Sequence, residues 1–286
     1  MGLFFLLCQK FTNLKNSIFL SLFLGFGTAL FWAAVVGTTW YFAHVVAFFF
    51  LTLALIAHFS KKDILSGILF SMAVLSRYPI LLGVIFFILQ LRNNRKRLIK
   101  FLLAAASLAP IHFAYSFLRF GNIFQTGYIE VYQTYLKTNY PYTILQAINS
   151  KLPLFGYLDP RNIPLHLFTF LIQPPIITNT LKISPSPYGM GILFTTPLLF
   201  LSFIPPFKKG IERNAILGAS GVALIDFLHY TQGWVQFGYR FALDFLPFLL
   251  IILAIRFKPT KLTLLLIIIS LLVTFWGVGQ AITLGW

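Results

Sequence analysis

Long apolar runs, separated by short clusters of lysine and arginine, constrain the fold of this chain more than any other feature. The runs cover residues 18–36, 40–59, 64–91, 98–118, 189–205, 215–230, 241–255 and 262–282. Most of them approach the length of about 20 apolar residues with which a helix crosses a bilayer. Only 10% of the residues are charged, against about a quarter in soluble domains. The sequence therefore predicts an all-α, polytopic integral membrane protein.

The basic clusters predict the orientation of these runs, because lysine and arginine collect on the cytoplasmic side of a membrane. They lie at residues 61–62, 92–100, 208–213 and 256–261. The run 64–91 has such a cluster at each end, so it must enter and return, yet its 28 residues are too few for two crossings. We expect two short helices with the sequence SRYP, residues 76–79, at the apex. The prediction is about seven full spans plus this helical hairpin.

The segment 119–188 is the longest without a clear span and is rich in proline, tyrosine and asparagine. We expect it to form an exterior, periplasmic-side loop region of short helices. It would separate N-terminal membrane helices in residues 1–118 from C-terminal membrane helices in residues 189–286. Within it, residues 163–175 are apolar but too short to span, so this stretch is expected to lie along the membrane interface.

Charge, cysteine content and motifs exclude several classes of function. The net charge of +16 could suggest nucleic acid, but the basic residues fall between apolar runs, so they indicate topology, and no nucleic-acid partner is expected. A single cysteine, Cys8, rules out an intramolecular disulfide and a cysteine-built metal site. No metal or cofactor motif is present. A divalent metal held by carboxylates is possible but has no signature.

Charged residues inside or at the mouth of apolar runs are energetically costly, so each is a candidate for function. Arg77 either satisfies carbonyls at the hairpin apex or binds an anionic lipid or phosphate. Asp226 and His229 share a helical face and could relay protons, although a buried interhelical hydrogen bond is favoured. Arg240 and Asp244, four residues apart, could form an ion pair that anchors a helix start. Alternatively, Arg240 meets an anionic substrate while Asp244 gives structural support.

The exterior segment offers weaker candidates. RFGNIFQTGY, residues 119–128, supplies Arg119 and two glycines at the membrane surface, either as a simple turn with a snorkelling arginine or as a polar ligand site. Glu130 and Asp159 are the only acids in this segment. Both are weak candidates for a general base, since neither has a partner at a spacing that identifies a catalytic pair.

Six stretches in order carry a resemblance to a known family. They are GTALFWAAVVGTTWYFAHVVAFFFLTLAL (27–55), LSGILFSMAVLSRYPILL (65–82), FLRFGNIFQTGY (117–128), LPLFGYLDPRNIPLHLFTFLIQPP (152–175), SPYGMGILFTTPLLF (186–200) and QFGYRFALDFLPFLL (236–250). Together they resemble the multi-spanning GT-C glycosyltransferases, in the branch of protein O-mannosyltransferases and bacterial lipid-linked sugar transferases.

The resemblance implies transfer of a hexose or pentose, with inversion, from a polyprenyl-phosphate donor to a glycan, lipid or protein acceptor on the exterior face. Its motif positions imply substrate binding by Arg77, Tyr78, Arg119, Tyr128, Tyr239 and Arg240. The chain departs from the family in its catalytic acid. Members carry this acid in a first exterior loop, whereas no Asp or Glu here precedes Asp63.

This departure leaves three readings open. The chain could be an N-terminally incomplete enzyme, or a separate chain could supply the missing front part. A non-catalytic membrane assembly partner would also lack the acid. A transporter or flippase for lipid-linked sugar is a further alternative, but it predicts internal two-fold repeats that the sequence does not show. The abundance of Phe, Ile, Lys and Asn favours a prokaryotic cytoplasmic membrane as the location.

Overall fold

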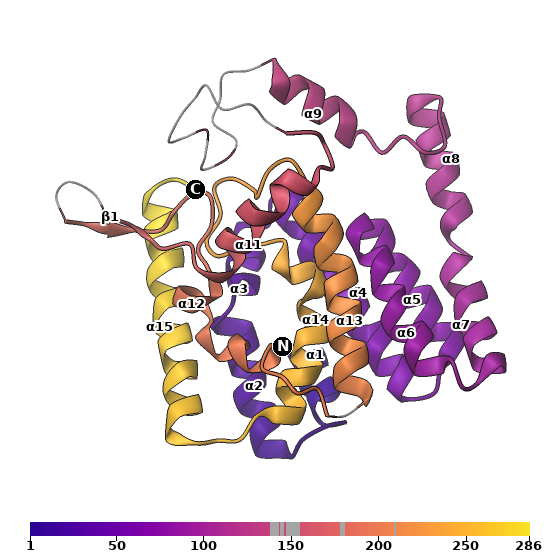
Figure 1. Cartoon of the computed structure of the whole chain (residues 1–286), viewed down its shortest axis with the longest axis horizontal. Helices are drawn as coiled ribbons and strands as arrows, with labels where there is room; N and C mark the ends of the chain where they lie inside the picture. The colour runs from indigo at the N-terminus through magenta and orange to yellow at the C-terminus, as the bar shows by residue number, and fades with distance from the viewer. Residues whose placement is uncertain (138–142, 144–145, 147–154, 178–180, 209) are drawn as a thin grey trace.

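The computed structural model describes residues 1–137, 143, 146, 155–177, 181–208 and 210–286. This part of the chain is mostly helical, as predicted (Figure 1). The prediction did not include a small antiparallel hairpin, in which β1 (Ile176–Ile177) pairs with β2 (Ile183–Ser184). Parts of the predicted exterior segment 119–188 and residue 209 of the cluster 208–213 lie outside the described residues.

Three described helical segments are long and apolar enough to cross a membrane. They are α4 (Thr39–Phe59), the consecutive helices α7 (Arg95–Ala106) and α8 (Ala109–Phe120), and α15 (Lys261–Thr283). A fourth arises if the bent pair α2 (Leu14–Phe26) and α3 (Ala29–Val36) counts as one span. The 51° bend follows from Thr28, whose hydroxyl donates to the Leu24 carbonyl and accepts from the Leu30 amide, so that it caps a new helix.

The helical hairpin predicted for 64–91 is present, with its break at the predicted apex. The first arm, α5 (Asp63–Ser76), ends where Arg77 adopts an extended conformation. The second arm consists of a 3₁₀ turn, η1 (Tyr78–Gly83), and α6 (Val84–Leu91). Gly67 lets α5 approach α7 closely, since a Cβ there would lie 2.5 Å from the Phe101 carbonyl oxygen. The first arm of the hairpin is therefore packed tightly against α7.

The predicted crossing at 189–205 is not a continuous helix, and this part of the prediction is corrected. It contains only a single turn, α12 (Ile192–Thr195), and a 3₁₀ segment, η3 (Pro197–Ser202). Proline has no amide hydrogen to donate and disfavours the helical conformation in the residue before it. Accordingly Thr196 is non-helical, with φ of −142°, and separates the two pieces.

The helix α14 (Ala242–Arg256) is the centre of the molecule, because every residue from Ala242 to Ala254 is buried. It packs against α4, η3 and α13 (Gly210–Leu228). At its C-terminal end, Arg256 Nε donates to Glu212 Oε1 of α13 at 2.8 Å. A helix surrounded in this way can be apolar on all sides without contacting lipid.

The remaining described elements lie at the N-terminus and in the predicted exterior segment. The short helix α1 (Gly2–Cys8) packs beside α2. The exterior segment contains α9 (Tyr128–Leu136), a 3₁₀ turn η2 (Pro160–Asn162) and α11 (Ile163–Leu171). In Figure 1, α9 lies at the opposite end of the molecule from the link between α14 and α15. The basic cluster 256–261 in this link is therefore far from the exterior segment.

Candidate functional site

A cavity of about 620 Å³ is lined in part by residues of the predicted exterior segment. Its lining comes from six separate parts of the chain: residues 36–44, 77–79, 124–135, 157–158, 225–241 and Trp286. Nearly all of these lie in segments that the basic clusters place on the non-cytoplasmic side. The cavity therefore brings together stretches that are far apart in the sequence but share one predicted side of the membrane.

The wall of the cavity is largely aromatic. Its rings belong to Trp40, Tyr41, Tyr78, Phe124, Tyr128, Tyr135, Tyr157, Tyr230, Trp234, Phe241 and Trp286. The ring of Tyr128 lies 6.4 Å from that of Trp40 and 6.4 Å from that of Tyr78, which joins α9 to α4 and η1. Burial raises the pKa of Tyr157 to about 12, so this residue presents a neutral phenol hydroxyl. The wall combines apolar surface with hydroxyl groups.

A buried polar network lies next to the cavity, and three of its members, His44, Arg77 and Asp226, line it. Arg77 Nε donates to Asp244 Oδ2 at 2.8 Å, and the other oxygen of Asp244 lies 2.7 Å from His44 Nδ1. Arg77 Nη2 is also 3.5 Å from Asp226 Oδ1. The break between α5 and η1 exposes Arg77 to all of these partners, since it sits at the end of a helix in an extended conformation. The charge of Arg77 is therefore compensated by two carboxylates.

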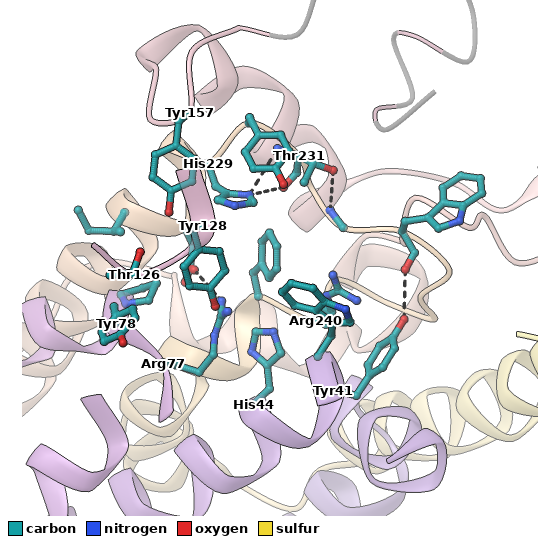
Figure 2. A pocket seen from close by; sticks show the side chains of 18 of the residues that line it. Tyr41, His44, Arg77, Tyr78, Thr126, Tyr128, Tyr157, His229, Thr231 and Arg240 are labelled. Carbon is teal, nitrogen blue, oxygen red and sulfur yellow. Dashed lines mark hydrogen bonds and ion pairs between the residues drawn. The ribbon is translucent and has the colours of Figure 1, made fainter. Parts of the chain in front are cut away.

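The network corrects the expected ion pair between Arg240 and Asp244. Arg240 precedes α14, which begins at Ala242, so the two residues do not share a helical face. Asp244 does act as a structural partner, but its ion pair is with Arg77, and its other oxygen is hydrogen-bonded to His44 Nδ1. Figure 2 shows the side chains of His44, Arg77 and Arg240 directed toward one common space from different elements.

Of the two alternatives for Asp226 and His229, a proton relay or a buried interhelical hydrogen bond, the structure shows an interhelical contact of Asp226. Asp226 contacts Arg77 of the hairpin, not His229. The Nδ1 atom of His229 instead lies 3.0 Å from the carbonyl oxygen of Thr231. The two side chains are not hydrogen-bonded to each other in the described structure, so they do not form a direct proton relay.

Arg240 is the cavity arginine whose charge is not compensated. Its guanidinium carbon lies 4.9 Å from the ring centroid of Tyr41 and 5.4 Å from that of Phe241. Its Nε is buried and has no hydrogen-bond partner in the described part of the chain. All six acidic residues are described, and none forms an ion pair with Arg240. A buried donor without a partner favours an anionic ligand at this position.

The loop before α14 holds Arg240 in place. Gln236 Oε1 accepts from the backbone amide of Arg240 at 3.3 Å, and Gln236 Nε2 donates to the Tyr188 carbonyl at 2.9 Å. The hydroxyl of Tyr41 donates to the backbone carbonyls of Val235 and Trp234. These contacts fix the loop to α4 and to the exterior segment, so Arg240 has little freedom to leave the cavity.

Four of the six residues proposed for substrate binding line the cavity, namely Arg77, Tyr78, Tyr128 and Arg240. Arg119 does not, since it is an exposed residue of α8 whose guanidinium contacts Tyr115 and Phe120 of the same helix. Tyr239 is buried beside the cavity, where its hydroxyl lies 2.7 Å from His166 Nδ1.

Neither weak candidate for a general base lines the cavity. Glu130 is exposed on α9, where its Oε1 accepts from Gln125 Nε2 at 3.4 Å. Asp159 forms an ion pair of 2.7 Å with Arg161 and caps η2. The Arg161 guanidinium lowers the pKa of Asp159 and occupies both of its oxygens. Asp159 therefore acts as a local structural residue.

Sequence reasoning missed the role of His44 and the partners of Asp244. His44 appeared only as one histidine inside an apolar run, and its carboxylate partner is 200 positions away along the chain. No local spacing signals such a contact. Across the described residues, no three His, Cys, Asp or Glu side chains come together in a way that could hold a metal ion.

No protein-family model, curated protein or solved structure matches the chain. The geometry and charge of the cavity are therefore the ground on which a function can be assigned.

Proposed function

We propose that the chain is a multi-pass protein of a cell membrane, in a prokaryote the cytoplasmic membrane. In this proposal its cavity binds a polyprenyl-phosphate-linked sugar. The sugar, a hexose or a pentose, is transferred on the exterior face to a glycan, lipid or protein acceptor. The reaction class is the one implied by the resemblance to GT-C glycosyltransferases.

A multi-pass topology is supported by the distribution of charge over the fold. The described structure has three or four apolar segments of sufficient length. α13 and the fully buried α14 lie among them and add further apolar helices. The cavity, in contrast, is lined by segments free of basic clusters. This separation is the one expected of a protein inserted with its basic links in the cytoplasm.

The uncompensated charge of Arg240 carries the proposal for the ligand. A polyprenyl-phosphate sugar has one negative charge on its phosphodiester, and a planar guanidinium suits phosphate oxygens in a partly dry site. The phosphate becomes the leaving group when the glycosidic bond breaks, so a fixed positive charge next to it stabilises the transition state. Arg77 cannot serve equally well because Asp244 and Asp226 already neutralise it.

The size and lining of the cavity agree with such a ligand. Its volume of about 620 Å³ lies within the range of about 300–1,000 Å³ typical of small-molecule sites. Aromatic faces offer apolar surface to a sugar ring and to the first prenyl units, while tyrosine hydroxyls offer hydrogen bonds to sugar hydroxyls. A ligand without any apolar or aromatic surface would leave this aromatic wall without a function.

Binding of undecaprenyl phosphate tests the proposal without requiring the sugar to be known. The full chain in lipid nanodiscs is titrated with undecaprenyl phosphate, and bound lipid is measured by native mass spectrometry. Loss of a charge-assisted hydrogen bond costs about 1.5–3 kcal/mol, so Arg240→Ala should weaken binding about 10- to 100-fold. Arg119→Ala, which removes an arginine outside the cavity, is the matched control and should leave binding unchanged.

Two results would contradict the proposal: equal effects of the two substitutions, or no binding by the unmodified chain. The rival functions differ in their products. A transporter would bind the lipid-linked sugar and move it across a vesicle membrane without cleaving it. A non-catalytic assembly partner would neither cleave nor move it.

A further inference from the structure

Asp226 has one carboxylate oxygen without a partner, and it lines the cavity. Its Oδ1 is 3.5 Å from Arg77 Nη2, whereas its Oδ2 is buried and has no hydrogen-bond partner in the described structure. Only 2% of the residue is exposed. Burying an oxygen of this kind without a partner is costly, so such an atom in a cavity points to a ligand that donates a hydrogen bond to it.

The other five acids do not offer an equivalent atom to the cavity. Both oxygens of Asp244 are bound, and so are those of Asp63 and Asp159. Glu212 pairs with Arg256 at the far end of α14, and Glu130 is exposed on α9. All six acidic side chains are described, and among them Asp226 is the one that lines the cavity.

Two residues that line the cavity therefore each carry a buried atom without a partner in the described structure: the donor Arg240 Nε and the acceptor Asp226 Oδ2. A ligand that satisfies both has an anionic group for the arginine and a hydroxyl or water for the carboxylate. A displacement at the anomeric carbon requires groups of both kinds: a positive charge for the leaving phosphate, and an acceptor for the proton of the attacking O–H.

We propose that Asp226 is the catalytic base of the sugar transfer, an inference that rests on the proposed function. The acceptor oxygen forms a bond to the anomeric carbon while the bond from that carbon to the phosphate oxygen breaks. The acceptor proton moves to Asp226 Oδ2, and the electron pair of the broken bond leaves on the phosphate, next to Arg240. Arg77 is a positioning residue that holds Oδ1, while Oδ2 has no partner in the described structure. Asp226 would thus take the place of the first-loop acidic residue that the family carries and that this chain lacks before Asp63.

Water as the acceptor gives a test that needs no knowledge of the natural acceptor. The full chain in nanodiscs is incubated with undecaprenyl-phosphate hexoses and pentoses, and the release of free sugar and undecaprenyl phosphate is followed by mass spectrometry. Removal of a general base typically lowers a rate about 10²- to 10⁴-fold. We expect Asp226→Asn to bind the donor as the unmodified chain does and to release sugar at least about 100-fold more slowly.

Rescue by a small carboxylate separates catalysis from a structural role. Asp226→Ala leaves space next to the acceptor, so added formate should restore sugar release, whereas formate should not accelerate the unmodified chain or Asp226→Asn. Asp63→Asn is the control, because it removes another buried, arginine-paired carboxylate that lies away from the cavity. It should retain both binding and release.

Each outcome decides between the two proposals. If the unmodified chain binds the donor and releases sugar, and Asp226→Asn releases sugar at the same rate, the assignment of Asp226 is overturned and the proposed function stands. Binding without any release by the unmodified chain also overturns a catalytic Asp226, and then only ligand binding remains. Absence of binding overturns both.

Discussion

Replacement of Asp244 by asparagine should destabilise the helices packed around α14. The substitution keeps the shape of the side chain but removes the negative charge between Arg77 and His44. Asp244 is fully buried in the first turn of α14, and both of its oxygens are engaged, at 2.7 Å and 2.8 Å. After the change, the carboxylate of Asp226, at 3.5 Å, is the only counter-charge left for Arg77. A buried cation would then lack its closest counter-charge.

Two typical free-energy costs give different expectations for the stability of this variant. Breaking a buried ion pair by removing one partner costs about 3–5 kcal/mol, whereas neutral hydrogen bonds between membrane helices average about 0.6 kcal/mol. Because an amide keeps the geometry and one acceptor, we expect a loss near the lower end of the first range, about 3 kcal/mol. A loss of this size would mean that the charge, and not only the hydrogen bonds, stabilises the site.

The single cysteine provides the assay. Cys8 is fully buried, so a thiol-reactive dye reports unfolding during a titration of detergent-solubilised protein with sodium dodecyl sulfate. Asp159→Asn is the control, since it removes a carboxylate from a surface ion pair, and its unfolding midpoint should not shift measurably. A loss below about 1 kcal/mol for Asp244→Asn would refute the reasoning, because the pair would then behave like ordinary neutral hydrogen bonds.

Three further variants test the packing, the pH dependence and the support of the site. Gly67→Ala should lower the free energy of unfolding by about 1–3 kcal/mol, because its Cβ would meet backbone atoms of α7. Gly279→Ala is the control, since the space around Gly279 is open, and it should not lower the free energy of unfolding. Labelling of the thiol during denaturation measures both variants. Burial lowers the pKa of His166 to about 4. In the unfolded chain His166 binds a proton below about pH 6.5, whereas in the folded chain it binds one only near pH 4. Its contribution to the free energy of unfolding should therefore fall across this window by up to about 3 kcal/mol. The fall in a His166→Asn variant should be less steep, and an equally steep fall would contradict this. Tyr41→Phe, which releases the loop before α14, should weaken binding of undecaprenyl phosphate less than Arg240→Ala does, and an unchanged affinity would show that the loop does not need this bond.

Features of the fold that depend on local sequence could be predicted. The hairpin break at SRYP and the tight link before α4 follow from proline, glycine and the alternation of apolar runs with basic clusters. The region 189–205 was harder, because its apolar composition masks the effect of Pro197 on the preceding residue. Hydrophobicity alone does not distinguish a spanning helix from a folded-back apolar segment.

The candidate site was predictable residue by residue but not as an arrangement. Arg77 and Arg240 were recognisable because charges in apolar runs are rare and costly. Which of them is neutralised depends on contacts over more than 100 positions, such as that of Arg77 with Asp244. Spacing along one helix suggested the partner of Asp244 incorrectly, because α14 begins only after Arg240.

The lining of the cavity reaches from Val36 at the end of α3 to Trp286 after α15, and the rings of Trp32 and Trp286 lie 6.3 Å apart. Loop closure over such a separation is entropically costly. Any molecule held there links the early and the late parts of the chain, so its binding energy should oppose the detachment of α15 as well as the loss of the cavity. Resistance of α15 to proteolysis should therefore rise with ligand concentration, because the bound ligand would hold the first and the last helices together.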